Sequence, residues 1–172
     1  DIDTIGEHHV IRLQFRNRIQ TRDKEYGSRD LARFDFSIDY LVDDYDLGVD
    51  FSDFVSDLEI TPARWLKIDF FSRWDVENSF IRELNTSYSV TDPGYWKLGI
   101  GNHFLKGQLD QYFIFGEYNL NENHKVYAVA KFDEKSDTFY EQRIGFMQRA
   151  LEKYGIKYEL RIFEGNRRES DF

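Results

Sequence analysis

Four carboxylates are the first candidates for chemistry, because general acid and base catalysis requires two such groups in one site. They are Glu141, Glu159, Asp69 and Asp75. Each lies in a segment where polar and apolar residues alternate. Carboxylates on the polar side of such segments more often pair with arginines than act in catalysis. No Gly-x-Ser-x-Gly elbow, phosphate-binding loop or dinucleotide fingerprint accompanies them. We therefore expect neither an enzyme nor a cofactor.

The histidines and one acidic turn are the candidates for a metal site. His8 and His9 are adjacent, so on an extended strand they would point to opposite faces. His103 and His124 are isolated near predicted turns. The acidic segment 43–50 lacks the glycine and the distal glutamate of a known calcium loop, and its acidic residues are Asp43, Asp44, Asp46 and Asp50. We expect no bound metal.

Composition limits the class of protein. The chain has 172 residues and a net charge of -9, which argues against a nucleic-acid surface because phosphate binding requires clustered Lys and Arg. The absence of cysteine excludes disulfides and thiolate chemistry. No run approaches the ~20 apolar residues of a membrane-spanning helix. Aromatic residues make up 17% and there are only two prolines, which favours β structure.

Alternation with a period of two residues is the strongest pattern in the chain, and such alternation is typical of half-buried β-strands. It is clearest in segments 10–21 and 29–43. In the second of these, one face has Phe34, Phe36, Ile38 and Tyr40. The same alternation predicts eight further strands, at 51–61, 64–76, 80–91, 96–104, 111–120, 125–133, 138–150 and 154–163.

The connections between these segments are too short for crossover helices, so the pattern predicts an antiparallel up-and-down meander of about ten strands. Turns are expected at Thr61-Pro62-Ala63, at Asp92-Pro93-Gly94 and within Arg149–Tyr154. Gly99 and Gly101 lie on one face in mid-strand, which suits close packing or bending. We interpret residues 1–172 as one β-barrel domain, or part of one.

Two environments fit such a meander. In a transmembrane outer-membrane barrel the apolar face meets lipid and the polar face lines the lumen, whereas a soluble lipocalin-like barrel holds a small apolar ligand inside. Strands of about nine or more residues and aromatics beside turns, such as Trp65 and Trp96, favour the membrane. A barrel enzyme such as a lipid hydrolase or acyltransferase is a third possibility, but it lacks a visible nucleophile. The predicted lumen-facing residues are Arg12, Arg16, Arg18, Asp35, Asp39, Asp69, Arg73 and Asp75.

A set of short phrases, in order along most of the chain, resembles a known family. They are Arg16-Asn17-Arg18-Ile19-Gln20-Thr21, Phe51-Ser52-Asp53, Asp57-Leu58-Glu59, Leu84-Asn85-Thr86, Tyr118-Asn119-Leu120-Asn121, Lys131-Phe132-Asp133, Tyr140-Glu141-Gln142 and the segment Tyr158 to Arg168. In this order they resemble the C-terminal barrel region of LptD, the lipopolysaccharide-assembly protein of the bacterial outer membrane, also called organic solvent tolerance protein.

The resemblance implies a large barrel that receives lipopolysaccharide from periplasmic bridge proteins and releases it among the outer-membrane lipids of the outer leaflet. It also implies a plugging lipoprotein in the lumen. By the same resemblance, residues 1–172 are expected to be the C-terminal portion of a larger barrel, with no periplasmic domain present. Proteobacterial members have a cysteine pair where this chain has Lys153 and Tyr154, which argues against a disulfide-controlled assembly step. The polar run Gly165 to Asp171 predicts a hairpin tip that awaits one more strand, and the terminal Phe172 has little weight as an insertion signal.

Overall fold

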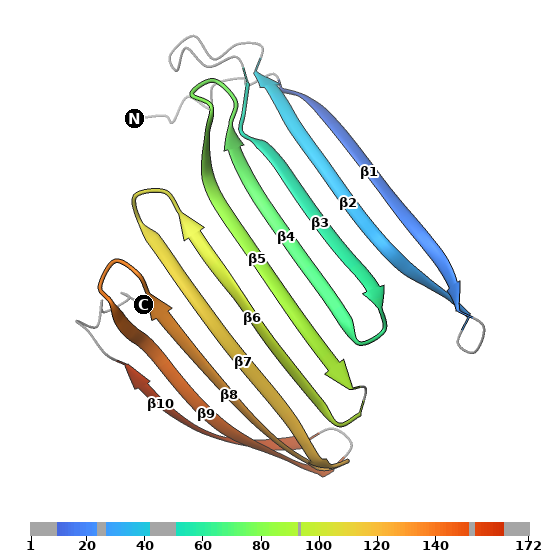
Figure 1. Ribbon diagram of the computed structural model, residues 1–172, viewed down its shortest axis with the longest axis vertical. Helices are drawn as coiled ribbons and strands as arrows, with labels where there is room; N and C mark the ends of the chain where they lie inside the picture. The colour runs from blue at the N-terminus through green and yellow to red at the C-terminus, as the bar shows by residue number, and fades with distance from the viewer. Residues whose placement is uncertain (1–9, 24–26, 42–50, 93, 152–153, 164–172) are drawn as a thin grey trace, which may run out of the picture.

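One antiparallel sheet contains the ten strands that the structure describes (Figure 1). The computed structural model describes residues 10–23, 27–41, 51–92, 94–151 and 154–163. The strands are β1 Val10–Asp23, β2 Gly27–Leu41, β3 Phe54–Ala63, β4 Leu66–Asp75, β5 Phe80–Asp92, β6 Trp96–Leu105, β7 Leu109–Asn121, β8 His124–Asp133, β9 Thr138–Leu151 and β10 Tyr154–Phe163. The predicted all-β meander is therefore confirmed.

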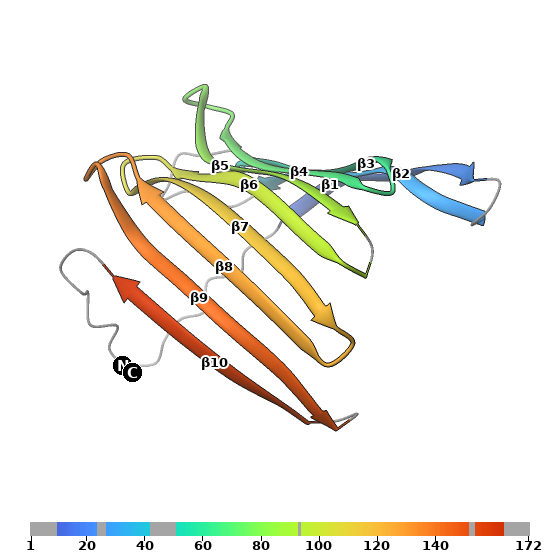
Figure 2. The same ribbon diagram turned by 60° about the horizontal axis from the view of Figure 1, so that its bottom comes forward.

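The sheet is open rather than closed into a barrel. Its strand order is the chain order from β1 to β10, so β1 and β10 are its two edges. Strands β6–β10 turn away from the plane of β1–β5, and the sheet forms a trough (Figure 2). The described residues contain no helix long and apolar enough to cross a membrane.

The register gives the sheet two chemically different faces, because residues directly opposite each other on antiparallel strands share a face. The apolar face includes, from β1 to β10, Leu13, Phe36, Leu58, Phe70, Tyr88, Ile100, Ile114, Ala128, Ile144 and Leu160. The polar face includes Arg16, Asp35, Asp57, Arg73, Asn85, His103, Glu117, Lys131, Glu141 and Glu159.

This single layer has no hydrophobic core: no hydrophobic side chain is buried among the described residues. The few buried side chains are polar, among them Ser56 and Ser72, whose hydroxyls are hydrogen-bonded to each other at 2.8 Å between the large residues of the apolar face. The apolar face of the ten-stranded sheet is therefore exposed. Soluble monomers rarely expose a contiguous apolar surface of this extent.

Two predicted turns had different outcomes. A turn after Asp92 is confirmed, since the Tyr95 N–H donates to the Asp92 carbonyl at 3.0 Å and Gly94 has a φ of 94°; Pro93 itself lies outside the described residues. The predicted turn at Thr61-Pro62-Ala63 is wrong, because β3 continues through Pro62 and Ala63 pairs with Leu66. A register shift between Ile60 and Ala63 accommodates the proline, which cannot donate to a regular ladder.

Candidate functional site: the polar face of the sheet

Ion pairs between β1 and β2 cover the first part of the polar face. Arg12 and Asp39 are directly opposite, and Nε and one terminal nitrogen of the guanidinium bind the two carboxylate oxygens at 2.7 and 2.8 Å. Arg16 and Asp35 are likewise opposite, with the Arg16 Nε 2.7 Å from the carboxylate. The register between β1 and β2 therefore matches cations with anions across the two strands.

Arg18 pairs with a carboxylate that we did not predict as a site residue. Its Nε lies 3.7 Å from Asp30, which also binds the Arg33 guanidinium at 3.0 Å. Asp69, a predicted lumen residue, instead contacts Lys67 at 2.9 Å. The partner of each charge depends on the register between strands, including a register shift after Ile19, and alternation within one strand does not contain that information.

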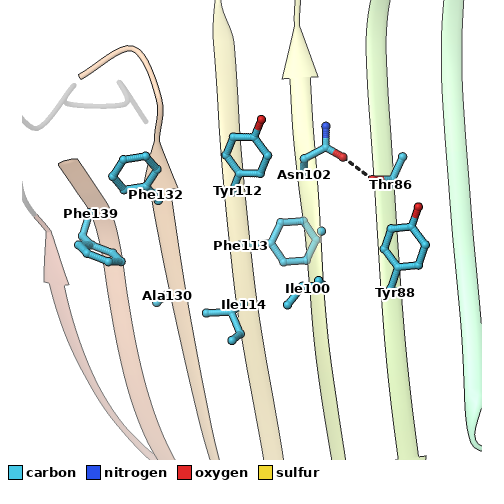
Figure 3. Close-up of a pocket in the computed structure, with 11 residues that line it drawn as sticks. Thr86, Tyr88, Ile100, Asn102, Tyr112, Phe113, Ile114, Ala130, Phe132 and Phe139 are labelled. Carbon is cyan, nitrogen blue, oxygen red and sulfur yellow. Dashed lines mark hydrogen bonds between the residues drawn. The ribbon is translucent and has the colours of Figure 1, made fainter. Parts of the chain in front are cut away.

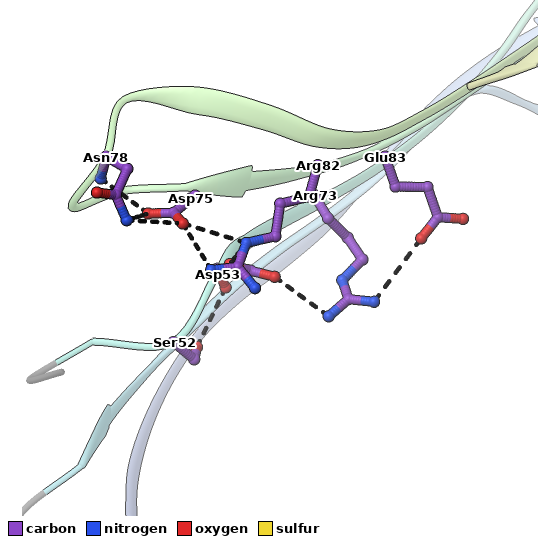
Figure 4. Close-up of polar contacts among 7 residues, drawn as sticks. All are labelled: Ser52, Asp53, Arg73, Asp75, Asn78, Arg82 and Glu83. Carbon is purple, nitrogen blue, oxygen red and sulfur yellow. Dashed lines mark hydrogen bonds and ion pairs between the residues drawn. The ribbon is translucent and has the colours of Figure 1, made fainter. Parts of the chain in front are cut away.

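Asp53 joins β4 and β5 through two arginines near the connection between these two strands (Figure 4). Its carboxylate lies 3.1 Å from both the Arg73 and the Arg82 guanidinium. Arg82 also binds Asp75 at 2.6 Å, and the Asn78 N–H donates to Asp75 at 2.8 Å. The predicted residues Arg73 and Asp75 thus belong to one cluster, and Asp53 and Arg82 are members that the prediction missed.

The two later candidate carboxylates lie on β9 and β10, and each binds cations. Glu141 contacts Lys131 at 2.9 Å and Arg143 at 2.6 Å. Glu159 binds Lys157 at 2.7 Å and also pairs with Arg161. These contacts agree with the expectation that the carboxylates pair with basic residues.

Aromatic rings lie over glycines on the later strands of the polar face. A Cβ added to Gly99 would be 2.4 Å from the Phe115 ring, and one added to Gly101 would be 2.5 Å from the Phe113 ring. These contacts confirm the close packing expected at the two glycines. Gly145 on β9 has the same relation to Tyr127 of β8, at 2.1 Å.

The third of these rings has a further partner. Because Gly145 has no side chain, the Tyr127 hydroxyl reaches across β9 and donates to Glu159 on β10. This hydrogen bond joins two strands that are not neighbours in the sheet.

A groove of about 420 Å³ lies mainly on the apolar face, between β5 and β9 (Figure 3). Two polar residues, Thr86 and Asn102, line the groove, and the Thr86 hydroxyl donates a hydrogen bond to the Asn102 side chain. The other lining is almost entirely apolar and aromatic, and it includes Tyr88, Ile100, Tyr112, Ile114, Phe132 and Phe139. The groove suits hydrocarbon rather than a polar substrate.

The metal candidates have these outcomes. His103 lies 3.8 Å from Glu83, and the His124 ring is hydrogen-bonded to Asn121 at 2.9 Å. Within the described part of the chain, no three His, Asp or Glu side chains are placed to hold a metal ion. His8, His9 and the acidic segment 43–50 lie outside the described residues.

The polar face is thus a surface of paired charges and aromatic rings. No protein-family model matches the chain, and no curated protein matches it significantly. The likeness to LptD therefore depends on the ordered sequence phrases alone.

Proposed function

We propose that the chain forms part of the wall of a β-barrel in the bacterial outer membrane, and that this barrel translocates lipopolysaccharide to the outer leaflet. The observation that supports the wall is the continuous apolar face across ten strands without a buried hydrophobic core. In a bilayer, lipid covers such a face while the polar face lines the lumen.

The exposure of the two faces supports this orientation over a soluble barrel with an apolar interior. On the apolar face Ile114 of β7 is 57% exposed, whereas on the polar face Glu141 of β9 is 4% exposed. Side chains crowd together on the concave face of a bent sheet and spread apart on the convex face. The lower exposure of the polar face therefore indicates that it is the concave face, as the lumen side of a barrel is. The apolar face is then convex, as the lipid side of a barrel is.

Aromatic residues at both ends of the apolar face support a membrane position. Trp65 and Tyr95 are exposed at the end that has the β1–β2 turn, and Tyr118 lies beside Trp96 there. Trp74 is exposed at the other end. Rows of Trp and Tyr at both interfaces are typical of outer-membrane barrels.

The lengths of the connections suggest how the barrel wall is oriented. At the β1–β2 end the five connections have two or three residues each, from the strand bounds. At the other end the segments 42–53, 76–79, 106–108 and 134–137 have twelve, four, three and four residues. Periplasmic turns of such barrels are short and extracellular loops are longer, so we place the β1–β2 end in the periplasm.

The cargo and partners of the proposed barrel follow from the resemblance to LptD. They are lipopolysaccharide, a plugging lipoprotein in the lumen and the periplasmic bridge proteins that deliver the glycolipid. Charged rows on the polar face, such as Arg12 with Asp39, offer groups that a phosphorylated, sugar-rich headgroup could contact.

The membrane position is testable with tryptophan reporters. In a background where Trp65, Trp74 and Trp96 are replaced by Phe, Ile114→Trp places a reporter on the apolar face and Val129→Trp places one on the polar face. In phosphatidylcholine vesicles with brominated acyl chains, we expect quenching of the reporter at 114 and iodide quenching of the reporter at 129. Absence of bromine quenching at 114 would overturn the proposal in favour of a soluble barrel, in which the apolar face is turned inward, away from lipid.

The cargo is testable by photo-crosslinking in the bacterium that makes the protein. A photoreactive residue at position 14, on the polar face beside Asp35, should form lipopolysaccharide adducts that disappear when lipopolysaccharide synthesis is blocked. The same residue at position 120, near the periplasmic end of the apolar face, is the control. Adducts that form only at position 120 would contradict transport along the polar face.

A further inference from the structure

The outer edge of β1 is a long, regular strand edge. β1 runs for 14 residues from Val10 to Asp23 and pairs only with β2 among the described strands. Edge strands of soluble proteins are usually short or are interrupted by Pro, bulges or inward charges, because an open edge is a template for another strand. β1 has no proline, and its single register shift lies after Ile19.

The side chains of β1 give this edge an excess of exposed positive charge. Arg12, Arg16 and Arg18 lie on the polar face, and their side chains are 57% to 69% exposed. The carboxylates that they bind on β2 are only 19% to 26% exposed. Each guanidinium has five N–H donors, more than one carboxylate uses. The edge therefore presents a row of cations with remaining hydrogen-bonding capacity.

The other edge of the same sheet does not complement this row. If β10 paired with β1 and the apolar faces were aligned, Lys157, Glu159 and Arg161 would face the arginine row. Glu159 is the one carboxylate of this set, and it already binds Lys157, Arg161 and the Tyr127 hydroxyl. Two copies of β1 would likewise place arginines opposite arginines. Neither pairing of β10 with β1 nor pairing of β1 with a second copy of β1 would therefore supply carboxylates to the arginine row.

We propose that the outer edge of β1 docks an antiparallel strand whose polar face has Asp or Glu at alternate positions and whose other face is apolar. β2 is the example within the chain, since it offers Asp39, Asp35 and Asp30 to the same three arginines from the other side. This inference rests on the proposed function, because an added strand continues the trough toward a complete barrel wall.

Three synthetic 14-residue peptides test the docking edge on the folded protein in detergent micelles. The first alternates Val, Ile or Phe with Asp, the second has Lys for each Asp, and the third has the residues of the first in scrambled order. We expect the acidic peptide to bind about tenfold more tightly than the lysine peptide, from three cross-strand ion pairs. The preference should weaken in high salt.

A cysteine in the peptide locates the contact, since the chain has no cysteine of its own. Leu13→Cys and Leu160→Cys place one thiol on the apolar face of β1 or of β10. We expect a disulfide between the acidic peptide and the Leu13→Cys protein, and little with the Leu160→Cys protein. In the double variant, a disulfide within one chain would show that β1 and β10 close on each other and would overturn the proposal.

A variant with two arginines replaced by neutral residues separates loss of peptide binding from loss of folding. Arg16→Gln with Arg18→Gln introduces a residue type already present at Gln14 and Gln20 on the same face. We expect this variant to retain its β-sheet circular dichroism and lose the preference for the acidic peptide. An unchanged preference would overturn the inference. The reporters at 114 and 129 separate this outcome from failure of the proposed membrane position, because they do not involve the β1 edge.

Discussion

Between β1 and β5 the polar face is covered by charged side chains that pair across strands, whereas between β6 and β10 three aromatic rings lie over glycines. Arg12 and Asp39 are typical of the first region, and Tyr127 over Gly145 is typical of the second. The bend in Figure 2 falls in the second region. Flexible charged side chains tolerate neighbours of many shapes, but a ring on a glycine tolerates almost none.

The two regions should therefore respond differently to substitution. Exposed ion pairs contribute little because side-chain entropy and water offset the attraction. Close-packed contacts resist added volume because neighbouring atoms must move. Unfolding of the detergent-solubilised protein by denaturant measures both.

Gly101→Ala should have the largest effect. The new Cβ would be 2.3 Å from the Thr86 carbonyl oxygen and 2.5 Å from the Phe113 ring, and a backbone oxygen of a neighbouring strand cannot turn aside. We expect a loss of about 3 kcal/mol in the free energy of unfolding. Gly155→Ala is the matched control, since its Cβ would meet nothing closer than 3.6 Å. Equal losses in both variants would refute the importance of the close contact.

Glu141→Gln should come second. This side chain is 5% exposed and serves both Lys131 and Arg143, so its neutralisation leaves two cations without their carboxylate. We expect a loss of about 2 kcal/mol, as for hydrogen bonds to charged groups. Glu117→Gln, which alters a more exposed pair with Lys125, should cost less than about 1 kcal/mol. A larger loss at Glu117 would reverse the ranking.

Tyr127→Phe retains the ring over Gly145 and removes only the hydroxyl that donates to Glu159. We expect a loss of about 1 kcal/mol in the free energy of unfolding. Tyr118→Phe, at a side chain that is half exposed, should change stability very little. If Tyr127→Phe is also neutral, the hydrogen bond across β9 does not stabilise the sheet and ring packing alone explains the region.

Arg12→Gln should have the smallest effect on the free energy of unfolding, although its pair with Asp39 has two hydrogen bonds. The guanidinium is well exposed and competes with water for the carboxylate. The loss should shrink in high salt. A loss as large as that of Gly101→Ala would show that charge pairing controls the first region more strongly than we infer.

All ten strands could be predicted because alternation is a property of each segment by itself. The error at Pro62 arose because a register shift let the strand continue past a residue that usually ends one. Asp30 and Asp53 could not be identified as partners, since their contacts depend on how two strands align. Gly99 and Gly101 were predicted to pack closely, but the rings that cover them became known only from the register.

The ring over Gly145 also has an evolutionary consequence. A larger residue at 145 would be disfavoured for as long as Tyr127 occupies the space above it, and a smaller residue at 127 would leave that space empty. Neither position can change alone without cost. In related sequences the two positions should therefore change together, as residues in direct contact do.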